Sequence, residues 1–331
     1  MRVPLLRAVA VAATAVATLT ADARPAGPPQ DQQRGQFRIT GRVVPIYATV
    51  TDRSGLPVEG LTADDFEVRD DGRVQEITVF SADDVPLSAL VLLDGSSSMM
   101  QSLDRVIEGA NSFVVRMLPD DRARIGSFAE RLRLSPRFTS DRDELLAYLT
   151  NEFNIVLGLA THLWHSMAQS VETLAEEQGK RVLLVLSDGH NWVSPGRTVL
   201  GGGRNARGQP RPALSFGAGP PTTEFEVLRE AARRDVIVYA ISMWVWFNGE
   251  MTRPSNALQQ LALETGGGYF ELREFDEVNS TFTQIARELR QGYVLGFVPA
   301  ELDGERHELD VRVRRDRATV KARRSYVAEA R

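Results

Sequence analysis

A short stretch of oxygen-bearing side chains ends an apolar run in the first third of the chain. Residues 90–93 are apolar, and Asp94, Ser96 and Ser98 follow at alternate positions. Small oxygen donors on one tight loop suit hard divalent cations such as Mg²⁺, Mn²⁺ and Ca²⁺, and suit zinc less well. The spacing therefore suggests a metal-binding loop. The same side chains could instead cap a following helix, because Asp and Ser favour helix N-caps.

Two later segments carry side chains that could join this loop. Ser187-Asp188-Gly189 follows the apolar run 181–186, and Thr161 precedes a helical stretch. Ligands of open parallel sheets bind beyond the carboxyl ends of the strands, so we expect Asp188 and Thr161 at the edge that carries Asp94. Two carboxylates would balance the charge of a divalent cation, and hydroxyls would complete its coordination without adding negative charge. An open position on the cation could then accept a carboxylate from another molecule.

The elements that must position these residues are strands alternating with helices. Predicted strands cover 89–93, 123–128, 132–138, 181–186, 236–242 and 269–272, and predicted helices cover 103–118, 141–151, 162–178, 224–234, 256–265 and 277–291. Continuous apolar strands are typical of a sheet that is covered on both faces. The helices between them have apolar residues at helical spacing. The pattern predicts a doubly wound, mostly parallel α/β sheet.

Strand patterns also flank this α/β region on both sides. Between 37 and 81 the residues alternate in character around Ile46, and Asp70-Asp71-Gly72 is typical of a hairpin turn. Strands are predicted on both sides of this turn, over 66–68 and 74–80. After the α/β region, further strands are predicted over 293–298, 309–313 and 318–322. Few residues remain after Gly292 to bury an independent core. We therefore expect the flanks, 37–84 and 292–328, to complete one small β-sandwich into which the α/β domain, 85–291, is inserted.

Composition narrows the class of protein. The 331 residues are 43% hydrophobic and 25% charged, which is typical of a globular chain with ample material for a core. The formal net charge of −5 argues against nucleic acid as a partner, since nucleic-acid binders present a concentrated basic surface. The chain has no cysteine, so it has no disulfide framework and no cysteine for a lipid anchor.

The N-terminus is typical of an export signal. Arg2 and Arg7 stand at the start of the apolar stretch 8–19, and Ala21-Asp22-Ala23 fits a cleavage site. We predict a signal peptide over 1–23 and a linker over 24–36, rich in Pro, Gln and Gly. The apolar stretch is short for a membrane span, so no stable span is expected after cleavage. The predicted location is the periplasm or the exterior; an uncleaved N-terminal anchor is the alternative.

Five of these residues, in this order, resemble the metal-ion-dependent adhesion site of von Willebrand factor type A domains: Asp94, Ser96, Ser98, Thr161 and Asp188. The resemblance implies that the two serines and the threonine ligate the cation. It implies that the two aspartates ligate it directly or through water. It also implies the α/β fold already expected from the strand and helix pattern.

Three further segments, 58–66, 261–267 and 288–296, resemble an exported bacterial subfamily, the VWFA-related proteins of acidobacteria. This resemblance extends over about residues 37 to 327. The sequence departs from the subfamily one helical turn after Thr161, where His165 replaces an acidic residue and makes the local charge less negative. We expect His165 and His190 to hydrogen-bond around the ligands or simply to pack there. A transition-metal site that also includes His162 is the alternative, because imidazole suits such ions.

Together these observations predict a binding or adhesion-type module, not an enzyme. It would capture a carboxylate of a partner protein through Mg²⁺, or Mn²⁺ or Ca²⁺. The alternative is a metal-dependent hydrolase that uses a metal-activated water. The sequence contains no Gly-x-Ser-x-Gly nucleophile elbow and no Gly-rich phosphate loop with a lysine. It does not specify the partner, the physiological cation or the oligomeric state.

Three other segments allow two interpretations each. The Gly- and Pro-rich loop 199–221 carries Arg204, Arg207 and Arg211, and could be a solvated insert or a basic gate for an acidic partner. The apolar run 243–247 could be core or an exposed contact patch. In 312–324 the alternation of arginines favours the solvated face of a strand over a basic binding patch.

Overall fold

The structure is a computed structural model that describes residues 43–152, 160–191, 198–200, 214–216, 222–247 and 250–329. The predicted signal peptide and linker lie outside the described residues, and so does most of the loop 199–221. Within the described ranges, no helix combines the length and the apolar character that crossing a membrane requires.

Six strands form the central sheet: β5 Leu87–Asp94, β6 Arg122–Phe128, β7 Leu132–Leu134, β8 Lys180–Ser187, β11 Val236–Met243 and β14 Tyr269–Leu272. Their order is β14-β11-β8-β5-β6-β7, and every neighbouring pair is parallel except β6 and β7. The predicted doubly wound, mostly parallel sheet is thus confirmed. The strand predicted over 132–138 is shorter, because Pro136 has no N–H to continue a ladder. It also runs antiparallel to β6.

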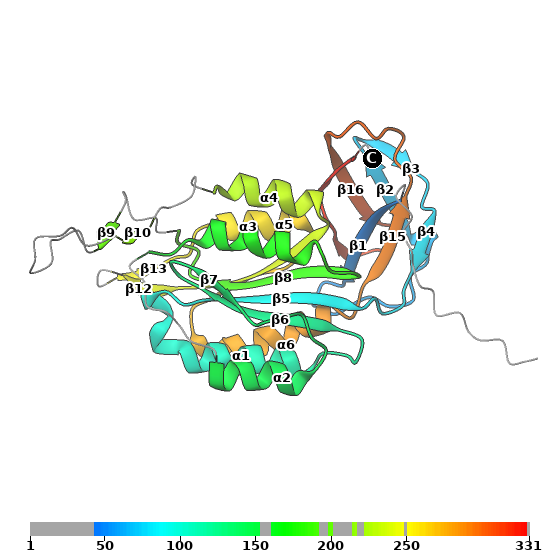
Figure 1. Ribbon diagram of the computed structural model, residues 1–331. Helices are drawn as coiled ribbons and strands as arrows, with labels where there is room; N and C mark the ends of the chain where they lie inside the picture. Colours follow the sequence, from blue (N-terminus) through cyan, green and yellow to red (C-terminus); the bar gives the residue numbers. More distant parts are fainter. Residues whose placement is uncertain are drawn as a thin grey trace, which may run out of the picture. The chain divides into compact units, whose positions relative to one another are not determined.

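Helices cover both faces of this sheet (Figure 1). One face carries α1 Leu103–Val115, α2 Arg142–Ala147 and α6 Val278–Glu288, and the other carries α3 Leu163–Leu174, α4 Glu224–Arg233 and α5 Ala257–Thr265. Short helical turns are η1 Ala63–Asp65, η2 Ser97–Ser102, η3 Tyr148–Glu152 and η4 Phe275–Glu277. The helices begin and end within a few residues of the predicted bounds, and most are shorter.

Alternate residues of β5 enter two separate cores. Val91 packs in the core with Phe113 of α1 and Phe282 of α6, and Leu92 packs in the core with Leu163 of α3. All of these side chains are fully buried. Between Ala89 and Leu93 the strand is continuously apolar because neither of its faces meets water. Its polar residues stand near its two ends, Ser88 at the start and Asp94 at the carboxyl end.

Two antiparallel sheets complete the described fold, in the orders β17-β1-β15-β4 and β18-β16-β2-β3. Their strands are β1 Val44–Thr51, β2 Phe66–Asp70, β3 Arg73–Gln75, β4 Val79–Ser81, β15 Tyr293–Phe297, β16 Arg306–Val313, β17 Thr319–Lys321 and β18 Ser325–Val327. Both sheets combine strands from before and after the α/β region and share one core, which includes Ile46, Phe66, Leu295 and Leu309. The strands of the two flanks therefore form the expected sandwich, while the domain boundaries stay predictions.

The strand predicted over 74–80 is wrong as a single element. β3 continues the hairpin, with Asp71 and Gly72 at φ 46° and 78° in the turn, as a two-residue hairpin requires. β4 then pairs with β15 in the other sheet, so the chain changes sheets between Gln75 and Val79. Two small ribbons lie elsewhere: β9 Thr198–Leu200 with β10 Leu214–Phe216, and β12 Val245–Phe247 with β13 Glu250–Thr252.

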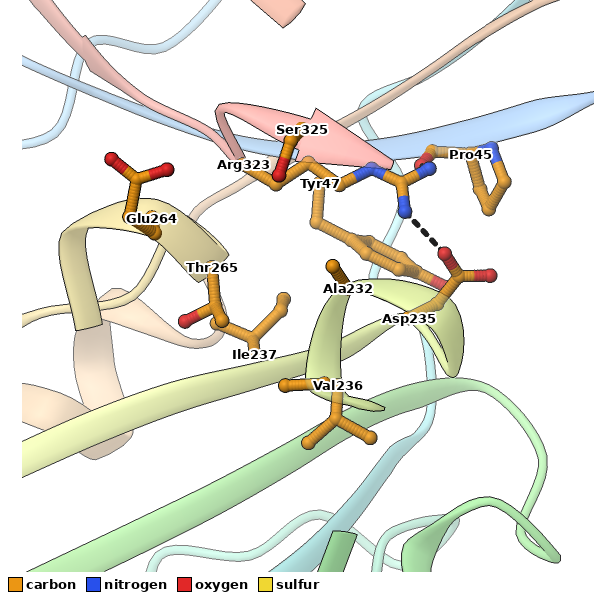
Figure 2. Close-up of a pocket in the computed structure, with 11 residues that line it drawn as sticks. Pro45, Tyr47, Ala232, Asp235, Val236, Ile237, Glu264, Thr265, Arg323 and Ser325 are labelled. Carbon is orange, nitrogen blue, oxygen red and sulfur yellow. Dashed lines mark hydrogen bonds and ion pairs between the residues drawn. The ribbon is translucent and has the colours of Figure 1, made fainter. Parts of the chain in front are cut away.

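Arg323 connects the sandwich to the amino edge of the central sheet. Its guanidinium pairs with Asp235, which precedes β11, and donates to the carbonyl of Pro45 in β1 (Figure 2). The pocket beside it is lined by Tyr47 and Thr265 among others. Its volume is only about 10 Å³, which is at most enough for one water molecule. The expectation that the arginines of 312–324 lie on a solvated strand face is therefore wrong for Arg323, whose side chain is buried in this junction.

Candidate metal site

The predicted metal loop lies at the carboxyl edge of the central sheet. β5 ends at Asp94, and the N–H of Gly95 donates to the carbonyl of Phe128 at the end of β6 (2.7 Å). β8 pairs directly with β5 and ends at Ser187. Because parallel neighbours end at the same edge, Asp188 comes to lie beside Asp94, as the sequence predicts.

Four of the five predicted ligands are joined by hydrogen bonds. The Ser98 hydroxyl donates to Asp188 Oδ2 (2.7 Å), and its oxygen lies 2.9 Å from that of Ser96. Asp94 Oδ1 accepts from the N–H of Ser96 (2.8 Å), and its Oδ2 accepts from the hydroxyl of Ser187 (2.6 Å). The sequence prediction assigned no role to Ser187. The Ser187 hydroxyl holds Asp94 in place. The sequence gives one sign of this role, a small hydroxyl residue directly before Asp188.

The direction of these hydrogen bonds leaves lone pairs available. Ser98 has one hydroxyl proton and gives it to Asp188, so the proton between the two serines comes from Ser96. Each hydroxyl oxygen then has a free lone pair while its proton stays in a hydrogen bond to an acceptor. Either oxygen can then face a cation while Ser98 keeps its hydrogen bond to Asp188 and Ser96 keeps its hydrogen bond to Ser98.

The two carboxylates are buried without a lysine or arginine partner, although the ring of His190 lies beside Asp188. Asp94 is 1% exposed and Asp188 is 5% exposed, and within the described residues no Lys or Arg forms an ion pair with either. Burial, and next the charge of Asp188, raise the pKa of Asp94 to about 7. Burial also acts to raise the pKa of Asp188, but hydrogen bonds from His190 and Ser98 hold it below its usual value. At neutral pH the site therefore has excess negative charge.

These residues fit a hard divalent cation. The donor set consists of carboxylate and hydroxyl oxygens, which are the ligands of Mg²⁺, Mn²⁺ and Ca²⁺. A cation would supply the positive charge that the buried pair Asp94 and Asp188 lacks. It would also be a Lewis acid, able to attract one more anionic oxygen from outside the chain.

A family model of the von Willebrand factor type A domain matches residues 89–190, a range that includes all five predicted ligands. The chain contains a von Willebrand factor type A domain. Whether it belongs to the acidobacterial subfamily stays a prediction. Among curated proteins, no sequence matches significantly.

The chain is also similar to solved structures of low sequence identity. An aerotolerance-related membrane protein from Bacteroides fragilis is 17% identical, with 61% of this chain and 98% of that chain covered and a TM-score of 0.44. The domain of the type V pili tip protein Mfa5 from Porphyromonas gingivalis is 15% identical, with coverages of 62% and 95% and a TM-score of 0.43. A von Willebrand factor type A protein from Catenulispora acidiphila is 9% identical, with coverages of 88% and 75% and a TM-score of 0.46.

Thr161 lies in the type A domain at the start of the segment that leads into α3. The N–H of the next residue, His162, donates to the carbonyl of Ala129, just after β6 (2.8 Å). This bond places Thr161 near the carboxyl end of β6. Within the described residues, however, no hydrogen bond joins its hydroxyl to the other four predicted ligands. Its role as a ligand stays a prediction.

The histidines of the type A domain occupy different positions around the site. The backbone N–H of His190 donates to Asp188 Oδ1 (3.0 Å), and the ring Nδ1 of His190 lies 3.4 Å from the same oxygen. The hydrogen bond to Asp188 raises the pKa of His190. His165 is exposed and its Nδ1 lies 3.3 Å from the hydroxyl of Thr222. In the described part of the chain, these two rings and His162 do not gather into a three-ligand cluster of the transition-metal type.

The apolar run 243–247 is divided between the two interpretations. Met243 and Val245 are buried, but Trp246 is 70% exposed and pairs across the β12–β13 ribbon with Met251, which is also exposed. β12 lies against η2, the helical turn that contains Ser98. The exposed pair is therefore apolar surface carried by a ribbon that contacts the predicted metal loop. Nothing further follows for the loop 199–221, whose arginines are outside the described residues.

Proposed function

We propose that the type A domain binds an acidic side chain of a partner protein through a divalent cation. The cation would be held by Asp94, Ser96, Ser98, Thr161 and Asp188. The observation that carries this proposal is the buried pair Asp94 and Asp188, which has no Lys or Arg partner among the described residues. A cation supplied from solution would neutralise the pair, and its remaining coordination position would accept a carboxylate.

The residues around the loop support binding of a protein more than of a small molecule. Ser97 is exposed next to the proposed ligands, and Trp246 presents a large apolar side chain on a ribbon that contacts η2. Exposed aromatic side chains are frequent centres of protein interfaces. A partner could therefore place a carboxylate on the cation and an apolar side chain against Trp246. Mg²⁺ is the expected cation, with Mn²⁺ and Ca²⁺ as the other candidates.

The raised pKa of Asp94 favours a second candidate, a metal-dependent hydrolase with a metal-activated water. A carboxyl group that titrates near neutral pH can act as a general acid or base. The shift has a simpler cause, however: two carboxylates are buried side by side, and a bound cation would lower the pKa of both. We therefore favour the binding module.

Calorimetry tests the proposed cation site. MgCl₂ or MnCl₂ is titrated into the metal-free chain, its Asp94→Ala variant and the matched control Asp120→Ala, which removes an exposed carboxylate at the opposite edge of the sheet. We expect one binding event in the wild type and in the control, and none in Asp94→Ala. Equal heats for wild type and Asp94→Ala would contradict the proposal.

Capture experiments test the partner and the location. An envelope extract passed over the immobilised chain should release a partner on EDTA, and immobilised Asp94→Ala should retain nothing beyond the background. A partner that Asp94→Ala retains equally in EDTA would bind elsewhere. We also propose export, to the periplasm or beyond; N-terminal sequencing of the secreted chain should then begin after Ala23.

A further inference from the structure

A second group of ligand-type side chains lies in the sandwich, outside the type A domain match. Asp70 ends β2 and Asp71 is in the following turn, while His307 stands on the neighbouring strand β16. One atom from each side chain comes within 4.8 Å of the other two. Asp70 and His307 are mostly buried, whereas Asp71 is exposed at the turn. The group is therefore at the surface end of the sandwich core.

The two carboxylates face the same ring nitrogen. His307 Nδ1 lies 3.2 Å from Asp70 Oδ1 and 3.0 Å from Asp71 Oδ2. A ring nitrogen has either one proton or one lone pair, so a single proton would have to serve both oxygens. In a tetrahedral zinc site with bonds of about 2.0–2.1 Å, ligand atoms lie about 3.3 Å apart. The two nitrogen–oxygen distances are close to that value.

Each of the three side chains is also held from the outside, at the atom that faces away from the group. Tyr326 donates its hydroxyl to Asp70 Oδ2 (3.1 Å), and the N–H of Glu308 donates to Asp71 Oδ1 (2.9 Å). His307 Nε2 lies 3.2 Å from Asp303 Oδ1. In a neutral ring whose proton is on Nε2 and faces Asp303, the Nδ1 lone pair would face the two aspartates. Metal-binding histidines are oriented in this way by an outer carboxylate.

We propose that Asp70, Asp71 and His307 bind a divalent transition-metal ion of the zinc class. One nitrogen and two carboxylate oxygens suit zinc better than Mg²⁺ or Ca²⁺, which prefer oxygen alone. The ion would tie the β2–β3 turn to β16, with Asp303 orienting the histidine. In a chain without cysteine, this metal link would stabilise the folded sandwich, as a disulfide does in other small domains. The alternative is a protonated His307 whose proton is shared by the two aspartates.

Metal analysis distinguishes the two. The full-length Asp94→Ala chain is used, so that the proposed type A site contributes no metal; it is stripped with chelator and dialysed against limiting ZnCl₂. Asp71→Asn is then added to this background. Asparagine tolerates the positive φ of 46° at this position, so the turn is kept while a ligand charge is lost. The matched control is Asp310→Asn, which removes an exposed carboxylate from the same strand β16.

We expect one zinc per chain in the Asp94→Ala background and in the Asp310→Asn control, and a loss of at least tenfold in zinc affinity with Asp71→Asn. Asp303→Asn should weaken zinc binding by about 10- to 100-fold, as removal of an outer carboxylate does. Absence of zinc from the background would overturn the proposal in favour of the shared proton. Equal zinc affinity with and without Asp71→Asn, or an equal loss with Asp310→Asn, would also overturn it. The result does not depend on whether the type A domain binds Mg²⁺.

Discussion

The two edges of the central sheet both bury charged side chains, but they neutralise them differently. At the amino edge, Asp121 pairs with Arg290 and Asp235 pairs with Arg323. At the carboxyl edge, Asp94 and Asp188 lie together with no Lys or Arg partner among the described residues. The first edge contains its own arginine partners, whereas beside Asp188 at the second edge lies only the half-exposed ring of His190 among the described basic side chains. The comparison teaches that a buried carboxylate that lacks a Lys or Arg partner is a better candidate for a cation site than one that the chain pairs with its own arginine.

The largest expected effect comes from removing a cation at the amino edge. In Arg290→Met, the almost fully buried Asp121 keeps its hydrogen bonds from the N–H groups of Leu87 and Leu118 but loses its charge partner. Leaving a buried charge without its partner costs about 3–5 kcal/mol of unfolding free energy. Urea denaturation measures the change. Adding Asp121→Asn should recover part of the lost unfolding free energy. A loss of only a few tenths of a kcal/mol in Arg290→Met would contradict the contrast between the edges.

The carboxyl edge should respond to pH in the absence of metal. Because the pKa of Asp94 is raised from 3.8 to about 7, the folded chain binds more protons than the unfolded chain between these values. The unfolding free energy of the metal-free protein therefore falls as pH rises from about 4 to 7, by up to about 4 kcal/mol.

Urea denaturation in EDTA at pH 4.5 and pH 7.5 measures this loss. Asp94→Asn lacks the titrating group and should lose less stability over the same interval. Saturating Mg²⁺ should abolish the loss in the wild type but leave Asp94→Asn unchanged. A wild type and variant with the same pH dependence would show that the pair is not the source of the effect.

At the amino edge, Lys180 should give the opposite slope. Its Nζ is buried and donates to the carbonyl of Leu289 (3.3 Å), and burial, with the charge of Arg290, lowers its pKa to about 8. The unfolded chain then binds more protons between pH 8 and 10.5, so the unfolding free energy rises with pH in this window by up to about 3 kcal/mol. Lys180→Met should lack this contribution. Comparing the two proteins at pH 8 and pH 10 cancels the contribution of the tyrosines common to both.

The smallest expected effect concerns His165, one helical turn after Thr161. His165→Asp restores the acidic residue of the subfamily that the sequence resembles, and adds negative charge near the proposed cation. Because the side chain is exposed, the gain in Mg²⁺ affinity should be a few-fold, within about 1 kcal/mol. Calorimetry with His165→Asn as the uncharged control measures it. Equal affinities for the two variants would place His165 outside the influence of the site.

The parts of the candidate site that follow from strand ends could be predicted from sequence. Asp94 and Asp188 each end a continuous apolar run, and parallel strands end at one edge, so the sequence predicts both residues at the same edge of the sheet. Ser187 was not predicted to hold Asp94, because that contact depends on β5 and β8 being direct neighbours. A residue pattern alone does not give the order of strands.

Contacts between segments distant in the chain could not be predicted either. The alternation around 312–324 correctly indicated exposed arginines, but not that Arg323 meets Asp235 across the junction. The group of Asp70, Asp71 and His307 likewise depends on the register between β2 and β16. The change of sheet after Gln75 had no signal, because no Gly or Pro marks residues 76–78.

The pairing of β1 has a consequence for the order in which the chain assembles. Among the described strands, β1 forms its ladders with β15 and β17, and Val44 pairs with Phe297. Pairings this distant form late, because the intervening chain must first be brought together. The α/β region has shorter connections, and α6 leads into β15 through residues 289–292 only. We therefore expect the sandwich to close after the α/β region has folded, with most of β1 lacking its ladder partners until β15 is available.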